Sequence, residues 1–216
     1  MGFFHRFLQA DVWVILDTAQ YVSGTSRSWQ NRDLIKTPQG ERWLTVGVRK
    51  QSKAPICDIM LADSSWRQDN LNLLSANYRE APYFQEIMPL LKELYAFPCE
   101  RLVEFNLKSI GMLMQLLGID IQTVLASELN PAGKSNDLLV DVLKKSGSTR
   151  YLSGLGAKDY FEPEPFIKAG IEVVWQEFTH PVYPQLHGEF VPYLSSIDLL
   201  FNCGTERSRQ IIRSIG

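Results

Sequence analysis

The chain has 216 residues, of which 45% are hydrophobic and 21% are charged, as in an ordinary soluble globular protein. A formal net charge of -2 at pH 7 offers no basic surface to nucleic acid or an anionic membrane, so a nucleic-acid partner is not expected. The three cysteines, Cys57, Cys99 and Cys203, form no CxxC pair, which argues against a zinc site or a disulfide framework and favours a cytoplasmic protein.

The N-terminal part of the chain predicts short elements joined by loops. Residues 2–10 are expected to form a helix, and the unbroken apolar run at 12–16 predicts a strand covered on both faces, as in a parallel sheet. No apolar run here is long enough for a membrane-spanning helix. Strands at 33–36 and 43–48 are expected to pair as a hairpin, and 56–61 is a further candidate strand.

The middle third is predicted to be helical. Apolar residues recur at three- and four-residue spacing over 66–79, 83–95 and 101–117, and Gly118 is expected to cap the last of these helices. An exposed apolar face on this helical segment, at about 66–117, would support a homodimer. Helices buried in the core of a monomer would carry the same pattern, so both readings stay open.

The last third alternates between strands and helices. Strands are expected at 122–126, 149–152 and 171–175, with helices at 135–145 and 163–169 between them. Closing helices follow at 197–202 and 206–212. Strand, helix and strand in quick succession imply right-handed crossovers. We therefore expect one α/β domain over 1–216, with a mostly parallel sheet, helical crossovers and a helical middle segment.

Ligands of such sheets bind beyond the carboxyl ends of the strands, where the chain enters a loop. Polar residues stand at four of these ends: Asp17 with Gln20, then 127–128 with 133–135, then 153–156, and finally the loop 178–188. Because strand ends of a parallel sheet meet at one edge, these four groups are expected to converge. The last of them opens the stretch 180–204, in which three prolines fix the backbone between polar side chains.

Two of these groups have competing interpretations. The segment 128–138 has Gly, Lys and Ser before a helix, but Glu128 stands where a P-loop requires its first glycine. Capping of the helix by Ser135 or Asn136 is therefore weighed equally with phosphate contact by Lys134. Asp17 is either a ligand contact or a structural group, capping a helix or pairing with Arg27 or Arg32.

The loop histidines and the acid that follows them are treated in the same way. His180 and His187 could ligate a metal together with Glu189 or Asp198, but their spacing matches no established metal pattern, and a polar anchoring role is favoured. Asp198 lies in the first turn of the closing helix, where the helix dipole favours an acid, so a structural role is expected for it.

A set of short segments spread over nearly the whole chain has a recognisable pattern. They are Gly2-Phe3-Phe4-His5, Ala10-Asp11-Val12, Leu16-Asp17, Gln20-Tyr21, Gln30-Asn31-Arg32, Trp43-Leu44-Thr45, Asn77-Tyr78, Ala81-Pro82-Tyr83-Phe84, Tyr151-Leu152-Ser153-Gly154, and the run from His180 to Gly204. Together these segments resemble the WbqC-like protein family. Members of that family occur in bacteria, commonly among genes for O-antigen, capsule and other surface polysaccharides.

The resemblance implies a cytoplasmic enzyme of surface-polysaccharide biosynthesis, such as a transferase of an acyl or aminoacyl group acting on an activated or amino sugar. The alternative is a non-catalytic protein of the same pathway that binds a sugar nucleotide or acts as a scaffold. Family members carry a strand and a loop resembling His-Gln-Pro-x-Tyr-x-Pro before Gly-Phe-Phe, whereas Met1 directly precedes Gly2 here. This departure implies either that a strand and one wall of the site are missing or that the start codon is misplaced.

Carried over position by position, the resemblance implies catalytic roles for His180, Asp17 and His5. His180 is the candidate general base, because an imidazole titrates near neutral pH. Contacts to a small-molecule substrate, such as a sugar nucleotide, are expected from polar side chains of the same motifs and from Lys134: Gln20, Asn31, Arg32, Lys134, Ser153, Tyr183 and Gln185. Arg32 and Lys134 would neutralise a phosphate or carboxylate. The sequence predicts no metal site and identifies no cofactor.

Overall fold

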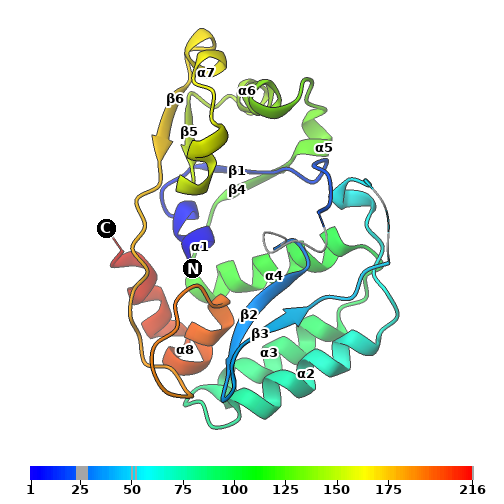
Figure 1. The fold of residues 1–216 in the computed structure, drawn as a ribbon, viewed down its shortest axis with the longest axis vertical. Coiled ribbons are helices and arrows are strands. Elements are labelled where there is room, and N and C mark those ends of the chain that lie inside the picture. The colour runs from blue at the N-terminus through cyan, green and yellow to red at the C-terminus, as the bar shows by residue number, and fades with distance from the viewer. Residues whose placement is uncertain (23–28, 50, 52, 216) are drawn as a thin grey trace. The chain divides into compact units, whose positions relative to one another are not determined.

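The computed structural model describes residues 1–22, 29–49, 51 and 53–215. The chain forms two compact units, which we call unit 1 and unit 2 (Figure 1). Unit 1 consists of Met1, Ala19–Gly118 and His180–Ile215, and unit 2 contains Gly2–Thr18 and Ile119–Thr179. The expectation that both belong to one domain stays a prediction.

Unit 1 is a β-hairpin with four long helices. Its elements are β2 (Arg32–Thr37), β3 (Gly40–Thr45), the 3-10 turn η1 (Ile56–Asp58), α2 (Ser65–Tyr78), α3 (Phe84–Ala96), α4 (Leu102–Leu117) and α8 (Ser196–Arg213). The hairpin predicted from the sequence is present, with Arg32 opposite Thr45 and Thr37 opposite Gly40. Gly40 supplies the positive φ of 105° at the turn.

The three predicted middle helices form and use their apolar faces within unit 1. Ile87, Leu91 and Leu94 of α3 are buried, as are Leu74 of α2 and Leu102 of α4. Helix α4 ends at Gly118 in a left-handed conformation, as expected.

Helix α8 also contacts the C-terminal end of α4. Arg209 Nε donates to the Leu116 carbonyl oxygen at 2.8 Å, and Arg213 Nη1 donates to that of Leu117 at 3.0 Å. Two cations therefore satisfy carbonyl groups that have no partner inside α4 and stabilise the negative end of its dipole.

Unit 2 contains two short parallel strand pairs. Its elements are α1 (Gly2–Phe7), β1 (Val12–Ile15), β4 (Gln122–Leu125), α5 (Ala126–Leu129), α6 (Ser135–Lys145), β5 (Arg150–Ser153), η2 (Leu155–Tyr160), α7 (Glu164–Lys168) and β6 (Glu172–Trp175). Strand β1 pairs with β4, and β5 pairs with β6, in two separate two-stranded sheets. A cluster of Val140, Leu143, Phe166 and Ile171 forms an apolar core between α6, α7 and the start of β6.

These elements confirm the α/β class, with parallel strand pairs joined through helices. Two local expectations differ from the structure. The predicted strand at 56–61 is wrong, because 56–58 forms η1 and Met60 and Leu61 make only isolated bridges. Ile59 and Leu61 are nevertheless buried, so the apolar pattern of this segment indicated burial and not strand pairing. The four residues of β1 are half-buried rather than covered on both faces.

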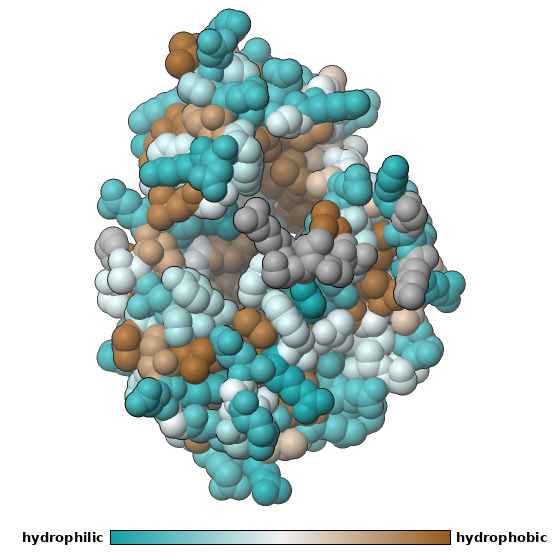
Figure 2. Space-filling view, in the orientation of Figure 1, coloured by the Kyte–Doolittle hydropathy of each residue, from teal (hydrophilic) through white to brown (hydrophobic). Residues whose placement is uncertain are grey.

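On the face of the molecule drawn in Figure 2, apolar side chains are interspersed among hydrophilic ones. Among the described residues, no helix is both long and apolar enough to cross a membrane.

Candidate functional site

A buried polar network connects the hairpin of unit 1 to the loop 180–195. The Tyr78 hydroxyl donates to Asp198 Oδ1 at 2.7 Å, and the Tyr183 hydroxyl donates to Asp198 Oδ2 at 2.9 Å. Asp198 and Tyr78 are fully buried. Burial raises the pKa of Asp198, while the hydroxyl donors and then the charge of Lys36 oppose that shift. Asp198 therefore acts as a fixed acceptor for two tyrosines.

Lys36 of β2 joins this network through its contacts with the loop 185–189. Its Nζ donates to Gln185 Oε1 at 3.2 Å, to the Gly188 carbonyl oxygen at 3.3 Å and to the Glu189 carbonyl oxygen. An ammonium group has three donors, and all three are used here. A lysine that is only 2% exposed thus holds the loop 185–189 against the hairpin.

The loop held in this way carries His180 inside an aromatic enclosure. The rings of Tyr183, Phe190 and Tyr193 lie 6.4, 5.6 and 5.4 Å from the His180 ring. Nδ1 lies 3.1 Å from the Pro181 carbonyl oxygen. Because a carbonyl can only accept, Nδ1 carries the proton and Nε2 has the lone pair. Burial lowers the pKa of His180, so the imidazole is neutral at physiological pH.

The two tyrosines of the enclosure differ in exposure. Nε2 of His180 is buried in this structure. Tyr193 is 69% exposed, whereas Tyr183 is buried and held by Asp198. Tyr193 is therefore the less firmly held of these two rings.

A second cluster of unit 1 combines a cation with two indole rings. The Arg32 guanidinium lies over the Trp43 ring at 4.0 Å from its centroid, and the Trp29 ring packs edge-on to Trp43 at 5.1 Å. Trp29 is 49% exposed. Burial raises the pKa of Tyr21, and the positive charge of Arg32 opposes that shift. The cluster offers an accessible indole beside a stacked guanidinium.

The two clusters share one face of the hairpin. Side chains alternate along a strand, so Arg32 and Lys36 project to the same side of β2, about 13 Å apart along the strand. Trp43 stands opposite Leu34 in the register and belongs to that face as well. The loop fixed by Lys36 and the stacked Arg32 therefore both lie on this side of the hairpin.

Three of the predicted binding residues in unit 1 make internal contacts. Asn31 Nδ2 donates to the Val46 carbonyl oxygen at 2.9 Å. Gln185 bonds both main-chain groups of Val191, through Oε1 at 2.8 Å and Nε2 at 2.9 Å. Gln20 is exposed, and its carbonyl oxygen accepts from Gln30 Nε2 at 3.5 Å. Asn31 and Gln185 thus shape the loops around the two clusters.

The remaining predicted residues belong to unit 2. Asp17 is buried at the end of β1 and accepts from the Ser127 amide at 2.9 Å, so it binds the start of α5. His5 is 2% exposed and its Nδ1 lies 3.2 Å from Gln176 Nε2. Ser153 is buried at the end of β5, and its carbonyl oxygen accepts from the Gln176 amide. Lys134 is exposed at the start of α6.

The structure brings two of the four expected strand-end groups together, since Asp17 meets Ser127 at the ends of β1 and β4. Ser153 instead meets Gln176, which lies outside the expected groups, at the ends of β5 and β6. Of the structural alternatives for Asp17, binding a helix start is the one observed, while Arg27 lies outside the described residues. The N-cap position of α6 is Lys134, whose side chain makes no capping hydrogen bond, and Asn136 Nδ2 donates to the Tyr160 carbonyl oxygen at 3.5 Å.

Sequence reasoning missed Lys36 and Tyr78 as members of the buried network. Lys36 is flanked by Ile35 and Thr37 in β2, a pattern that gives no sign that its side chain is enclosed. Tyr78 lies in one of the segments that define the resemblance, but it is not among the residues expected to form the site. The hydrogen bonds of Tyr78 cross 42 and 120 residues of sequence, a separation that local patterns do not reveal.

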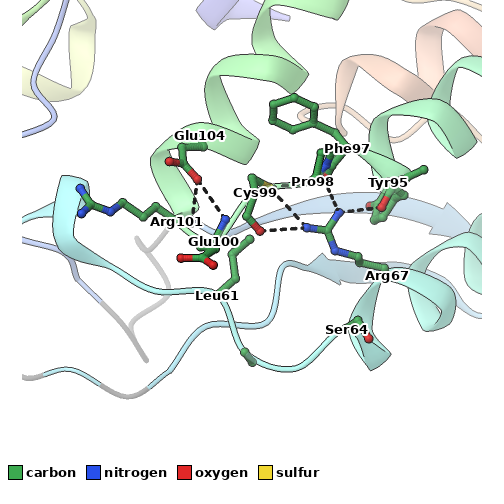
Figure 3. A pocket seen from close by; sticks show the side chains of 12 residues that line it. Leu61, Ser64, Arg67, Tyr95, Phe97, Pro98, Cys99, Glu100, Arg101 and Glu104 are labelled. Atoms are coloured by element: carbon green, nitrogen blue, oxygen red, sulfur yellow. Dashed lines mark hydrogen bonds between the residues drawn. The ribbon is translucent and has the colours of Figure 1, made fainter.

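Unit 1 also has a pocket of about 780 Å³ beside the end of α3 (Figure 3). The Arg67 guanidinium lines it and donates to the carbonyl oxygens of Tyr95 at 2.6 Å and Phe97 at 3.0 Å. Glu104 accepts from the amides of Glu100 and Arg101, both at 3.0 Å. Arg67 thus holds the C-terminal end of α3, and Glu104 holds the N-terminal end of α4. These contacts explain both charged side chains without a ligand.

His187 and Asp198, two of the residues that could have ligated a metal, engage other groups. His187 Nε2 lies 2.7 Å from the Asn77 carbonyl oxygen, while Asp198 is engaged by the two tyrosines. The part of the chain that the structure describes contains no group of three or more His, Cys, Asp or Glu side chains arranged to hold a metal ion.

The fold and these contacts define an α/β protein in which a buried charged network fixes a histidine-bearing loop. The chain belongs to the WbqC-like protein family, whose model matches residues 1–210. It is 30% identical over 209 residues to the uncharacterized protein Rv1507c of Mycobacterium tuberculosis, which covers 95% of this chain and 89% of that protein. No solved structure matches it.

Proposed function

We propose that the chain is an enzyme of bacterial surface-polysaccharide biosynthesis that transfers an acyl or aminoacyl group to an activated or amino sugar. The observation that supports it is the Arg32, Trp43 and Trp29 cluster on the same face of the hairpin as Lys36, which holds the loop 185–189. An exposed indole suits the apolar face of a sugar ring, and a guanidinium suits the phosphates of an activated sugar. Family membership supplies the biosynthetic context.

His180 serves as the general base in this proposal. Its Nε2 accepts the proton of the sugar amine as the nitrogen attacks the carbonyl carbon of a thioester or ester donor. The new C–N bond forms, and the bond from the carbonyl carbon to the thioester sulfur or the ester oxygen breaks. The proton then passes from His180 to the leaving sulfur or oxygen. A neutral imidazole is the form required, and burial favours that form. Because Nε2 is buried, the reaction needs a side chain of the enclosure to move, and we propose the exposed Tyr193 for this role.

Binding is the first test, using thermal unfolding of the purified protein with uridine-diphosphate and deoxythymidine-diphosphate sugars. A ligand at a hundredfold excess over its Kd stabilises the folded state by about 2.7 kcal/mol. We expect Arg32→Gln to abolish the rise in Tm. Arg42→Gln is the matched control, because Arg42 is exposed and stands opposite Ile35, on the other face of the hairpin. Equal loss in both variants would contradict a specific role for Arg32.

Turnover is the second measurement, made on the sugar that binds. Mass spectrometry follows addition of an acyl group from a thioester or aminoacyl ester donor. His180→Asn should abolish product while the Tm rise with the sugar is kept. Retained turnover in that variant would remove His180 from the mechanism.

The buried position of Nε2 favours one alternative, a non-catalytic protein that holds the sugar nucleotide for a partner of the same pathway. In that case the sugar raises Tm through Arg32 but no donor yields product. His180→Asn then leaves every measured property of the complex unchanged.

A further inference from the structure

Unit 2 has a half-buried arginine that lacks a counter-ion among the described residues. Arg6 lies on α1, and its guanidinium is 6.0 Å from the Phe3 ring centroid. The described part of the chain provides no hydrogen bond or ion pair to this guanidinium. By contrast, Arg150 on β5 is 67% exposed and bonds Glu172 Oε2 at 2.9 Å.

The environment of Arg6 makes an unpaired charge costly. Burial lowers the pKa of the guanidinium, and the Tyr151 phenol opposes that shift. An arginine nevertheless stays protonated at physiological pH, so the charge is retained where water is partly excluded. An anion supplied from solution would relieve this cost.

The guanidinium lies beside the turn that follows β5. A Cβ placed on Gly154 would stand 3.5 Å from Arg6 Nη1, at ordinary van der Waals distance, so the guanidinium lies against this turn and a methyl group there would cover part of it. Gly154 has φ −78° and ψ 149°, which any residue can adopt, so the backbone conformation does not require glycine.

The position within the fold also fits a ligand. The Ser153-Gly154 turn leaves the carboxyl end of β5, which is paired in parallel with β6, and loops at such ends commonly bind ligands. We propose that Arg6 and the Ser153-Gly154 turn form an oxyanion site that takes the phosphate or carboxylate group of a small molecule. The site lies in unit 2, whereas the Arg32 cluster lies in unit 1, and it does not depend on the proposed transferase activity.

The test is a titration of the purified protein with inorganic phosphate and, separately, with acetate at constant ionic strength, followed by the shift of the Gly154 amide in NMR spectra. Constant ionic strength removes general screening. The wild type should saturate with one of the two anions, which identifies phosphate or carboxylate as the group bound. Arg6→Gln should weaken that binding by about tenfold or more. Arg150→Gln should bind as the wild type does.

Gly154→Ala provides an independent variant that keeps the charge and the allowed backbone. The added methyl group occupies the space beside Nη1, so anion binding should weaken while the fold is unchanged. If Arg6→Gln fails to fold, this variant alone decides the question. Saturation that is equal in the wild type and Gly154→Ala, or no saturation with either anion, would overturn the site. The sugar-nucleotide measurement on Arg32 is unaffected by either result.

Discussion

At the scale of single residues, the two tyrosines that donate to Asp198 differ in which groups lose a hydrogen-bond partner when the tyrosine hydroxyl is removed. Tyr78 also accepts from the Lys36 amide at 3.1 Å, whereas the Tyr183 hydroxyl donates to Asp198 and interacts with Gln185, whose Nε2 also bonds the Val191 carbonyl oxygen. Both hydroxyls are enclosed, and an unsatisfied buried group costs more than the hydrogen bond it replaces.

We therefore predict that Tyr78→Phe lowers the free energy of unfolding by about 3 kcal/mol and Tyr183→Phe by about 2 kcal/mol. Each substitution removes one hydroxyl group, and only Tyr78→Phe leaves a buried main-chain amide, that of Lys36, without its acceptor. Urea unfolding at neutral pH measures both. An equal loss, or a larger loss for Tyr183→Phe, would show that the contact with Lys36 adds nothing.

The same residues show what a sequence can and cannot predict. The region of the loop 180–195 was identified from its prolines, tyrosines and histidines, because these residue types restrict a backbone locally. The partner that holds the loop was not identified, because Lys36 is about 150 residues away and its three acceptors include two main-chain oxygens. Main-chain acceptors leave no trace in residue type. Arg6 was not predicted from the sequence for a different reason, because its distinguishing feature is the lack of a counter-ion among the described residues.

At the scale of elements, helical periodicity predicted α2, α3, α4 and α6 with errors of a residue or two, since each buries an apolar stripe. The strand expected at 56–61 failed because an apolar run records burial and not hydrogen bonding. The closing helices were expected as two pieces, 197–202 and 206–212. The structure has one element, α8, with non-helical angles at Gly204 that divide it near the expected break.

Gly204 is the position of α8 that should be least tolerant of substitution. Its φ is 70°, and a Cβ would approach Tyr83 Cδ1 within 2.4 Å. Gly204→Ala should lower the free energy of unfolding by about 2–4 kcal/mol, from overpacking and the left-handed backbone together. Gly111→Ala is the control, because Gly111 lies inside α4 with nothing within 4 Å of the added carbon.

The control should behave in the opposite way. Alanine is the better helix former, so Gly111→Ala is expected to raise the free energy of unfolding by about 0.5–1 kcal/mol. Thermal and urea unfolding of both variants give the comparison. A stable Gly204→Ala protein would mean that Tyr83 and the bend in α8 adjust without cost.

At the scale of the whole molecule, the order of segments along the chain bears on how the two units unfold. Unit 1 is interrupted after residue 118 and resumes at residue 180, and unit 2 is interrupted after residue 18 and resumes at residue 119. Neither unit is one continuous stretch. The separate segments of each unit are joined through the chain of the other unit, so their ends are held together only while that other unit is folded. This arrangement favours a single cooperative unfolding transition, as expected for one domain.

Phe166→Ala tests this coupling from the core of unit 2. Phe166 is 1% exposed and stacks on Tyr151 at 5.7 Å, so its truncation should cost about 3–5 kcal/mol. Hydrogen exchange should then accelerate for amides of α3 in unit 1 as well as α6 in unit 2. Ile167→Ala, at the adjacent position that is 72% exposed, should change neither. Acceleration confined to α6 would mean that the units unfold independently and that the single-domain prediction is wrong.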